Sequence, residues 1–199
     1  NFEKIFYSIR AVIAKEFKTH ESVLETGKLY QVELQKFNSI IEEKADESLL
    51  SESILLLSEL LHRYYQQKVF ILIDEYDTPV HEAFLNGFYT QAINFLRTLL
   101  GNTLKGNQHL QKGILTGILR VSKESMFSDL NNVEVYSVLN KNYNQYFGFT
   151  QSEVDEMLDC YGLYNSKLDV KNWYNGYYFG DVEIYNPWSI LSFAKNNGE

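Results

Sequence analysis

The spacing of apolar residues along the first third of the chain predicts three helices. Between residues 2 and 17 apolar side chains recur every three or four positions, as they do on one face of a helix. The same spacing indicates a second helix around residues 30–44. The segment SLLSESILLLSELLHRYY, residues 48–65, is apolar around so much of its circumference that we expect this third helix to be largely buried.

A change from helical spacing to an unbroken apolar run predicts the first strand at residues 69–73, VFILI. A strand without polar positions is typical of the middle of a parallel sheet, where both faces are covered. Thr78 and Pro79 then indicate the N-cap and the first residue of a helix. A further helix is predicted over about residues 88–101, where apolar positions again follow the helical spacing.

Two more segments favour strands, KGILTGIL at residues 112–119 and VEVYSVL at residues 133–139. About forty residues with helical spacing separate the first two strands, which is the length of a crossover connection between parallel strands. The fold class that follows is α/β with a parallel sheet. In open sheets of this class ligands bind outside the carboxyl ends of the strands.

The chain changes character after residue 148. Thr150 and Glu153 form the pattern of a capping box, and Phe149 and Val154 have the spacing of a hydrophobic staple, so a helix should begin at residue 151. Gly162 is expected to end it.

The remaining residues predict a hairpin followed by a helix. In WYNGYYFGDVEIYNPW, residues 173–188, a turn is expected at Gly180 and Asp181, and Asn186 and Pro187 should begin the last helix. This gives two domains, 1–148 and 149–199, the second a small helix–hairpin–helix unit of lid or winged-helix type. We expect its aromatic residues to form its core rather than a platform for stacking bases: Trp173, Tyr174, Tyr177, Tyr178 and Trp188.

Candidate chemistry lies at the end of the first strand, in FILIDEYDTPV, residues 70–80. Asp74 and Glu75 follow the apolar run directly, and Asp77 comes two positions later. Two interpretations are open: the acids are solvated residues that end a strand, or they hold Mg²⁺ and activate a water in a nucleotide site. A phosphate-binding loop, GxxxxGK[ST], would support the second, but the sequence contains none, and GNTLKG at 101–106 lacks the Lys-Ser or Lys-Thr.

Composition narrows the classes of function. The formal net charge of −8 over 199 residues argues against a broad nucleic-acid surface, which needs clustered Lys and Arg. Cys160 is the only cysteine, so no internal disulfide can form and a reducing cytoplasm fits best. No apolar stretch approaches the roughly 20 residues that cross a bilayer. The four histidines lack metal-ligand spacing, and because the chain begins with Asn1 and a helical pattern, we expect a piece of a longer protein.

Several motifs in one order resemble a known family. These are LIDEYDTPV, GILTGILRVSKESMFSDLNNVEVYSVL, YFGFTQSEV, WYNGYYFG and YNPWSIL, from about residue 69 to the end. The chain resembles the AAA-ATPase-like family of bacterial proteins, whose members pair a P-loop ATPase domain with a distal nuclease-like domain. The resemblance implies a P-loop NTPase-like core that is truncated at its N-terminus. Its Walker A loop would lie upstream of Asn1 and its nuclease-like domain downstream.

The resemblance also implies roles for individual residues. Asp74 resembles the Walker B residue that holds Mg²⁺, and Glu75 resembles the catalytic base. Thr116 lies where a sensor residue would contact the γ-phosphate or the attacking water. Arg120 could stabilise charge in the transition state; it could also be a surface residue or a partner for Glu124. The implied cofactors are Mg²⁺ and ATP.

The expected activity is ATP hydrolysis that drives a conformational change in the intact protein, while this segment alone should be inactive. Expected partners are ATP and a protein or a second copy of the chain, with nucleic acid only through the downstream domain and no membrane. One alternative is a regulatory or interaction module of the same fold that does not hydrolyse ATP. Another is a metal-dependent phosphodiesterase that uses Asp74, Glu75 and Asp77 directly; its usual basic approach surface conflicts with the net charge. Asp77 could otherwise simply start the following helix.

Overall fold

The structure, a computed structural model, describes residues 1–27, 29–118, 126–127, 130 and 132–196. The chain forms two compact units, residues 1–133 and 134–199. The predicted domain boundary, at residue 148, falls inside the second unit. None of the helices in these described ranges is both long enough and apolar enough to span a lipid bilayer.

The first unit begins with the three predicted helices and a short 3₁₀ segment. Side chains cap two of the helices: Asn1 accepts a hydrogen bond from the Lys4 N–H (3.0 Å), and Asp46 accepts one from the Leu49 N–H (2.8 Å). The elements are α1 (Phe2–Thr19), η1 (Glu21–Thr26), α2 (Gln31–Ile41) and α3 (Glu47–Tyr65).

Two parallel strands follow, β1 (Val69–Ile73) and β2 (Leu110–Leu115), joined by helices α4 (Thr78–Leu85) and α5 (Tyr89–Leu104). The predicted crossover and parallel pairing are therefore confirmed, although β2 begins and ends a few residues before the predicted 112–119. Helix α4 begins at Thr78 with Pro79 in its first turn, and its N-cap is Asp77 rather than Thr78.

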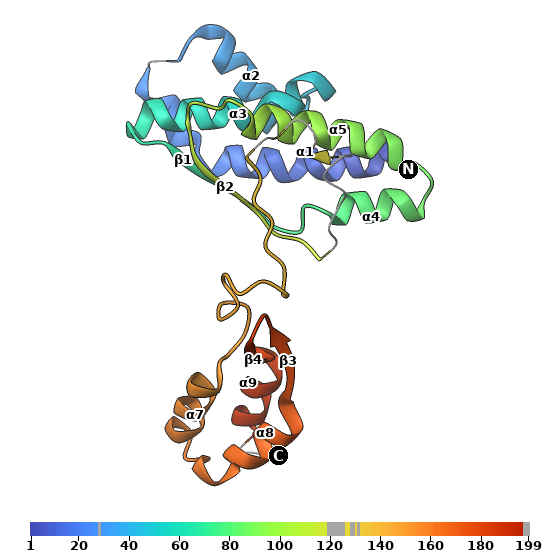
Figure 1. Ribbon diagram of the computed structural model, residues 1–199. Helices are drawn as coiled ribbons and strands as arrows, with labels where there is room; N and C mark the ends of the chain where they lie inside the picture. The colour runs from blue at the N-terminus through green and yellow to red at the C-terminus, as the bar shows by residue number, and fades with distance from the viewer. Residues whose placement is uncertain (28, 119–125, 128–129, 131, 197–199) are drawn as a thin grey trace. The chain divides into compact units, whose positions relative to one another are not determined.

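The core of the first unit lies between the long helices and one face of the sheet. Helices α1, α3 and α5 run side by side, and the aromatic rings of Phe17 and Phe37 meet at 4.9 Å between centroids (Figure 1). Ile73 of β1 and Leu115 of β2 pack against this core from the sheet. The ends of both strands are thus packed against the helical layer.

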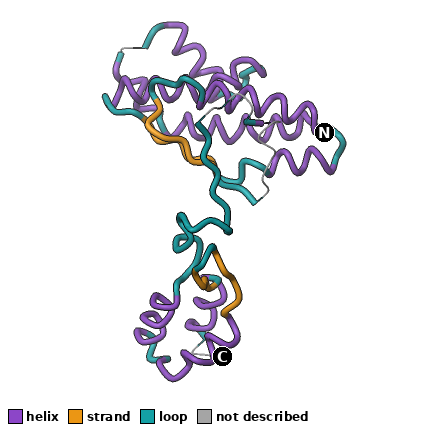
Figure 2. Tube along the Cα trace, in the orientation of Figure 1, coloured by secondary structure: helices purple, strands orange, loops and turns teal. Residues whose placement is uncertain are grey.

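The other face of the sheet is open, which contradicts the prediction of a central strand buried on both faces. Phe70 is 64% exposed and Leu72 is 72% exposed, and their partners across the sheet, Lys112 and Ile114, are exposed too. Figure 2 shows the two strands alone beside one another; in the described part of the chain each has a single sheet neighbour. The side chains of Phe70 and Leu72 therefore lie on a sheet face that no described part of the chain covers.

The third predicted strand, residues 133–139, is also absent: the structure has loop and turn there. Ser137 donates both its N–H and its hydroxyl to Asn140 Oδ1 (2.8 and 3.0 Å), and the Asn140 N–H returns to the Ser137 carbonyl (2.9 Å). Local side-chain bonds of this kind satisfy the backbone in a turn and compete with a strand ladder.

The second unit confirms the predicted capping box. Helix α7 (Gln151–Cys160) begins after Thr150, whose N–H and hydroxyl both donate to Glu153 Oε2 at 2.8 Å. These two bonds lower the pKa of the Glu153 carboxyl, because they stabilise its charged form. The helix ends before Gly162, which has the left-handed backbone (φ +72°) typical of a helix stop.

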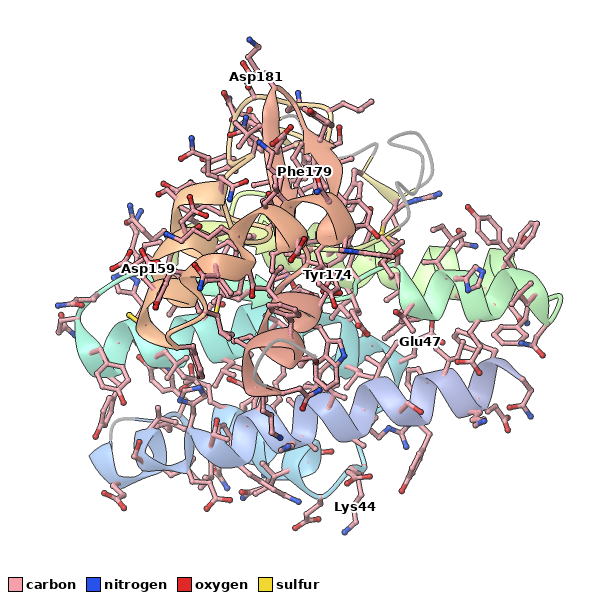
Figure 3. The ribbon with its side chains drawn as sticks, turned by 90° about the horizontal axis from the view of Figure 1, so that it is seen from below. Lys44, Glu47, Asp159, Tyr174, Phe179 and Asp181 are labelled. Carbon is pink, nitrogen blue, oxygen red and sulfur yellow. The ribbon has the colours of Figure 1, made fainter. Side chains whose placement is uncertain are left out.

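The predicted hairpin and last helix are confirmed as well. The antiparallel pair turns at Gly180 and Asp181, with Asp181 at its tip (Figure 3), where its carboxylate pairs with Lys141 at 2.8 Å. Asn186 caps the last helix and Pro187 begins it. The elements are η2 (Tyr164–Ser166), α8 (Lys167–Tyr174), β3 (Asn175–Phe179), β4 (Val182–Tyr185) and α9 (Pro187–Lys195).

Most of the aromatic residues assigned to the core of this unit lie on its surface, so that prediction is wrong. Only Tyr174 is partly buried, with its ring 5.7 Å from that of Phe193, whereas Trp173 is 82% and Trp188 is 80% exposed. Tyr177 and Tyr178 are exposed too. The inward stripes of α8 and α9 carry Val170, Ile190 and Phe193, and the two tryptophans fall off these stripes.

Two of the histidines that lacked metal-ligand spacing meet in space. His62 at the end of α3 and His109 before β2 are joined by a hydrogen bond between their Nδ1 atoms (2.9 Å). Partial burial lowers the pKa of His109, opposed by the charge of Glu59 and helped by the nearby His62, Arg63 and Lys68. The contact joins the helical layer to the start of the strand that leads to Thr116.

The lowered His109 pKa predicts a loss of stability in mild acid. Between this pKa and the unfolded value of 6.5 the unfolded chain binds more protons, so the free energy of unfolding falls as the pH falls through that window. Denaturant unfolding measured from about pH 7 to about pH 5 should show this slope. His109→Gln should flatten it, whereas His81→Gln, an exposed change on α4, should leave it in place. Equal slopes for wild type and His109→Gln would contradict the prediction.

Candidate functional site

The carboxyl ends of β1 and β2 lie together at one edge of the sheet, as predicted. Beyond the last strand residues, the Thr116 N–H donates to the Ile73 carbonyl (2.9 Å), and the Tyr76 N–H donates to the Thr116 carbonyl (3.1 Å). The turn after β1 and the loop after β2 are therefore hydrogen-bonded to each other. This places Asp74, Glu75 and Thr116 side by side.

Asp74 and Thr116 are in direct contact. The Thr116 hydroxyl donates a short hydrogen bond to Asp74 Oδ1, and the same oxygen accepts the Glu75 N–H at 3.0 Å. Both side chains are exposed at the sheet edge. Because these two bonds fall on Oδ1, the second carboxylate oxygen is available to a cation.

Glu75 has an unusual backbone for its residue type. Its φ is +52°, in the left-handed region that a side chain with a Cβ seldom adopts. Such a conformation costs on the order of 1–3 kcal/mol and persists only where its surroundings impose it, often at functional sites. Here the Thr78 N–H donates to the Glu75 carbonyl (3.1 Å) and the Glu75 N–H donates to Asp74, which together fix the sharp turn.

The third acid of the motif lies in a different environment. Asp77 is buried, and its Oδ2 accepts the Ile118 N–H at 3.1 Å. No group of three His, Cys, Asp or Glu side chains suited to a metal ion occurs in the described ranges. The arrangement thus gives no support to a phosphodiesterase in which all three carboxylates share a metal.

The remaining site residue proposed from the sequence, Arg120, lies outside the described residues. One contact at the site was missed by sequence reasoning: Gly117 lies against the Asp77 carboxylate. The available signal was the glycine of GILTG directly after Thr116, because a glycine that follows a strand often marks a close approach of backbone to another group.

The exposed groups define the chemistry open to this edge. Two adjacent carboxylates repel a phosphate, so an anionic ligand can bind here only together with a cation. A hard cation such as Mg²⁺ prefers carboxylate oxygens and keeps several waters, one of which a second carboxylate can deprotonate. Asp74, Glu75 and Thr116 thus suit a metal-bound phosphate and a water.

A curated protein of Azotobacter chroococcum mcd 1, described as an uncharacterized protein in the vnfD 5' region, is similar to this chain. The two are 31% identical over 128 residues, which cover 63% of this chain and 24% of the relative. The match thus spans about a quarter of the relative's length. No solved structure matches the chain significantly.

Residues 2–127 match the model of a family described as Predicted AAA-ATPase. The match includes both strands, the acids that follow β1, and the N-terminal helices, which the motifs quoted from the sequence did not cover. It ends before the second unit, so the later motifs lie outside it. Because the matched residues make up more than half of the chain, the protein belongs to the AAA-ATPase-like family.

Proposed function

We propose that this chain carries the magnesium-binding and water-activating half of an ATPase site in a P-loop NTPase-like core. The observation that carries the proposal is the contact between Asp74 and Thr116 across two parallel strands, with Glu75 next to it. Family membership supports an ATPase in general terms. The geometry supports the division of roles among these three residues.

In this proposal Asp74 holds Mg²⁺, directly or through water, and Mg²⁺ supplies charge stabilisation for the triphosphate. Glu75 accepts a proton from the attacking water. Thr116 is close enough to Asp74 to contact the same metal-bound phosphate or the water. Arg120 follows four residues after Thr116 in the sequence and would stabilise charge in the transition state.

The phosphate-binding loop is not part of these 199 residues, since the sequence contains no GxxxxGK[ST] motif. We place that loop upstream in the intact protein, as the family resemblance implies. The open sheet face of Phe70 and Leu72 is consistent with further segments of the intact protein packing on the sheet, because parallel sheets are normally covered on both sides. Residues 149–199 would be a lid, and hydrolysis in the cytoplasm would drive a conformational change.

The test is phosphate release by the full-length protein with ATP and Mg²⁺, compared with the same reaction in excess chelator. The proposal requires turnover that depends on Mg²⁺. Tight binding of Mg-ATP without phosphate release would instead favour the non-hydrolysing regulatory module. Hydrolysis of a phosphodiester by protein that fails to bind ATP would favour the phosphodiesterase.

A further inference from the structure

Asp77 is buried at a site where its two neighbouring acids are exposed. In the part of the chain that the structure describes, it is the one buried side chain among Asp, Glu, Lys and Arg residues, with 4% of its surface exposed. Burying a carboxylate is costly unless it is held by hydrogen bonds, so its retention here calls for a specific partner. That partner includes the loop after β2.

The loop after β2 packs directly on the Asp77 side chain. Asp77 Oδ2 accepts the Ile118 N–H at 3.1 Å. A Cβ on Gly117 would come within 2.4 Å of Asp77 Oδ1 and 2.9 Å of the Tyr76 ring, so only glycine fits between them. The carboxylate and the glycine are therefore complementary: the small residue lets the backbone approach, and the carboxylate holds it.

Thr116 is the residue that these contacts position. Its carbonyl accepts the Tyr76 N–H (3.1 Å) on one side, and two residues later the Ile118 N–H donates to Asp77 (3.1 Å). The backbone of Thr116 is thus held to the turn after β1 by bonds from both halves of that turn. From this position the Thr116 hydroxyl donates its hydrogen bond to Asp74.

We propose that Asp77 is a positioning residue that ties the loop after β2 to the turn after β1 and thereby holds Thr116 against Asp74. It acts through Thr116 and touches neither nucleotide nor metal. As far as turnover is concerned, this inference rests on the proposed ATPase function. The attachment of the loop after β2 to Asp77 is a property of the fold and can be measured without ATP.

The experiment compares four variants of the full-length protein. Asp77→Ala removes the acceptor, and Asp77→Asn keeps an oxygen that can accept the Ile118 N–H. Gly117→Ala places a methyl group against the Asp77 carboxylate and so displaces the loop after β2 without changing Asp77. Glu82→Ala, an exposed acid on α4, is the matched control.

The first readout is hydrogen exchange at the Ile118 amide. We expect Asp77→Ala to speed this exchange by at least about tenfold, because the N–H loses its acceptor. Asp77→Asn should retain most of the protection. Unchanged exchange in Asp77→Ala would overturn the proposal, whether or not the protein hydrolyses ATP. If Asp77→Ala fails to fold, exchange in Gly117→Ala, compared with Glu82→Ala, decides the same question.

The second readout is the separation of binding from turnover. A displaced Thr116 should lower kcat by about ten- to a hundredfold, as small misplacements of catalytic groups do, while the Kd for Mg-ATP changes by less than about threefold. Asp77→Asn should restore most of kcat. A lower melting temperature with unchanged kcat in both Asp77→Ala and Gly117→Ala would show a purely structural role. Absence of turnover in the wild type would refute the ATPase proposal. Hydrogen exchange at the Ile118 amide would then still decide whether Asp77 holds the loop after β2.

Discussion

Glu75→Gln in the full-length protein should leave ATP binding in place and lower kcat by about two to three orders of magnitude. Glutamine is nearly isosteric with glutamate, so the sharp turn at residue 75 and its hydrogen bonds to Asp74 and Thr78 should persist. On the proposed mechanism, what is lost is a group that would accept a proton only as the water attacks. Removing an interaction of the transition state lowers kcat more than affinity.

Single-turnover phosphate release and calorimetric titration with Mg-ATP measure the two effects separately. Glu82→Gln provides a matched control, because it makes the same chemical change on an exposed residue of α4, away from the sheet edge. The control should keep wild-type kcat. Equal rates for wild type and Glu75→Gln would remove the catalytic-base role. If the wild type and Glu75→Gln both bound Mg-ATP without releasing phosphate, the non-hydrolysing regulatory module would be favoured.

The parts of the fold that the sequence predicted well depend on chemistry between near neighbours. The capping box of Thr150 and Glu153 needs only four consecutive residues, and the helix starts where that pattern places it. The hairpin turn at Gly180 likewise follows from one residue that tolerates a positive φ. The parallel pairing of β1 and β2 followed from the length of the connection, since a parallel partner needs a crossover.

The failures concern what lies beyond neighbouring residues. The apolar run of residues 69–73 predicted a strand covered on both faces, but the exposure of Phe70 and Leu72 depends on which other segments pack on the sheet, and the run does not encode that. Residues 133–139 have the composition of a strand, yet the structure gives them no sheet partner, and local bonds from Ser137 and Asn140 prevail. A strand pattern is thus not sufficient for sheet pairing.

In the candidate site too, some features could be predicted from the sequence and others depend on three-dimensional packing. That Asp74 and Thr116 would meet followed from two strand ends at one sheet edge, and the structure confirms their contact. The different burial of Asp74 and Asp77 did not follow, because it depends on the three-dimensional packing around them, including the approach of Gly117 to the Asp77 carboxylate. The sequence left open whether Asp77 joins the other two acids at a metal or starts the following helix, and the structure makes it the N-cap of α4. The three-dimensional arrangement separates two exposed carboxylates from one that is held inside.

Asp74→Asn in the full-length protein should weaken the binding of Mg-ATP by about two orders of magnitude, which corresponds to about 2.7 kcal/mol. The asparagine oxygen can still accept the Glu75 N–H and the Thr116 hydroxyl, the two bonds that Asp74 Oδ1 accepts. Only the negative charge and one carboxylate oxygen are lost. Asp74→Ala removes the two hydrogen bonds as well, so it should in addition lower the melting temperature.

Measuring ATP affinity with Mg²⁺ and again in excess chelator isolates the metal-dependent part. In the wild type, Mg²⁺ should strengthen binding strongly, because the two carboxylates at the sheet edge otherwise repel the triphosphate. In Asp74→Asn that gain should largely disappear, and the affinity without metal should rise slightly, since one repelling charge is gone. Weaker ATP binding with Mg²⁺ together with slightly stronger binding without it would identify Asp74 as a metal ligand. A residue that only shapes the site would not give this combination. If Mg²⁺ strengthened binding equally in wild type and Asp74→Asn, the metal would be held elsewhere and the contact with Thr116 would be structural.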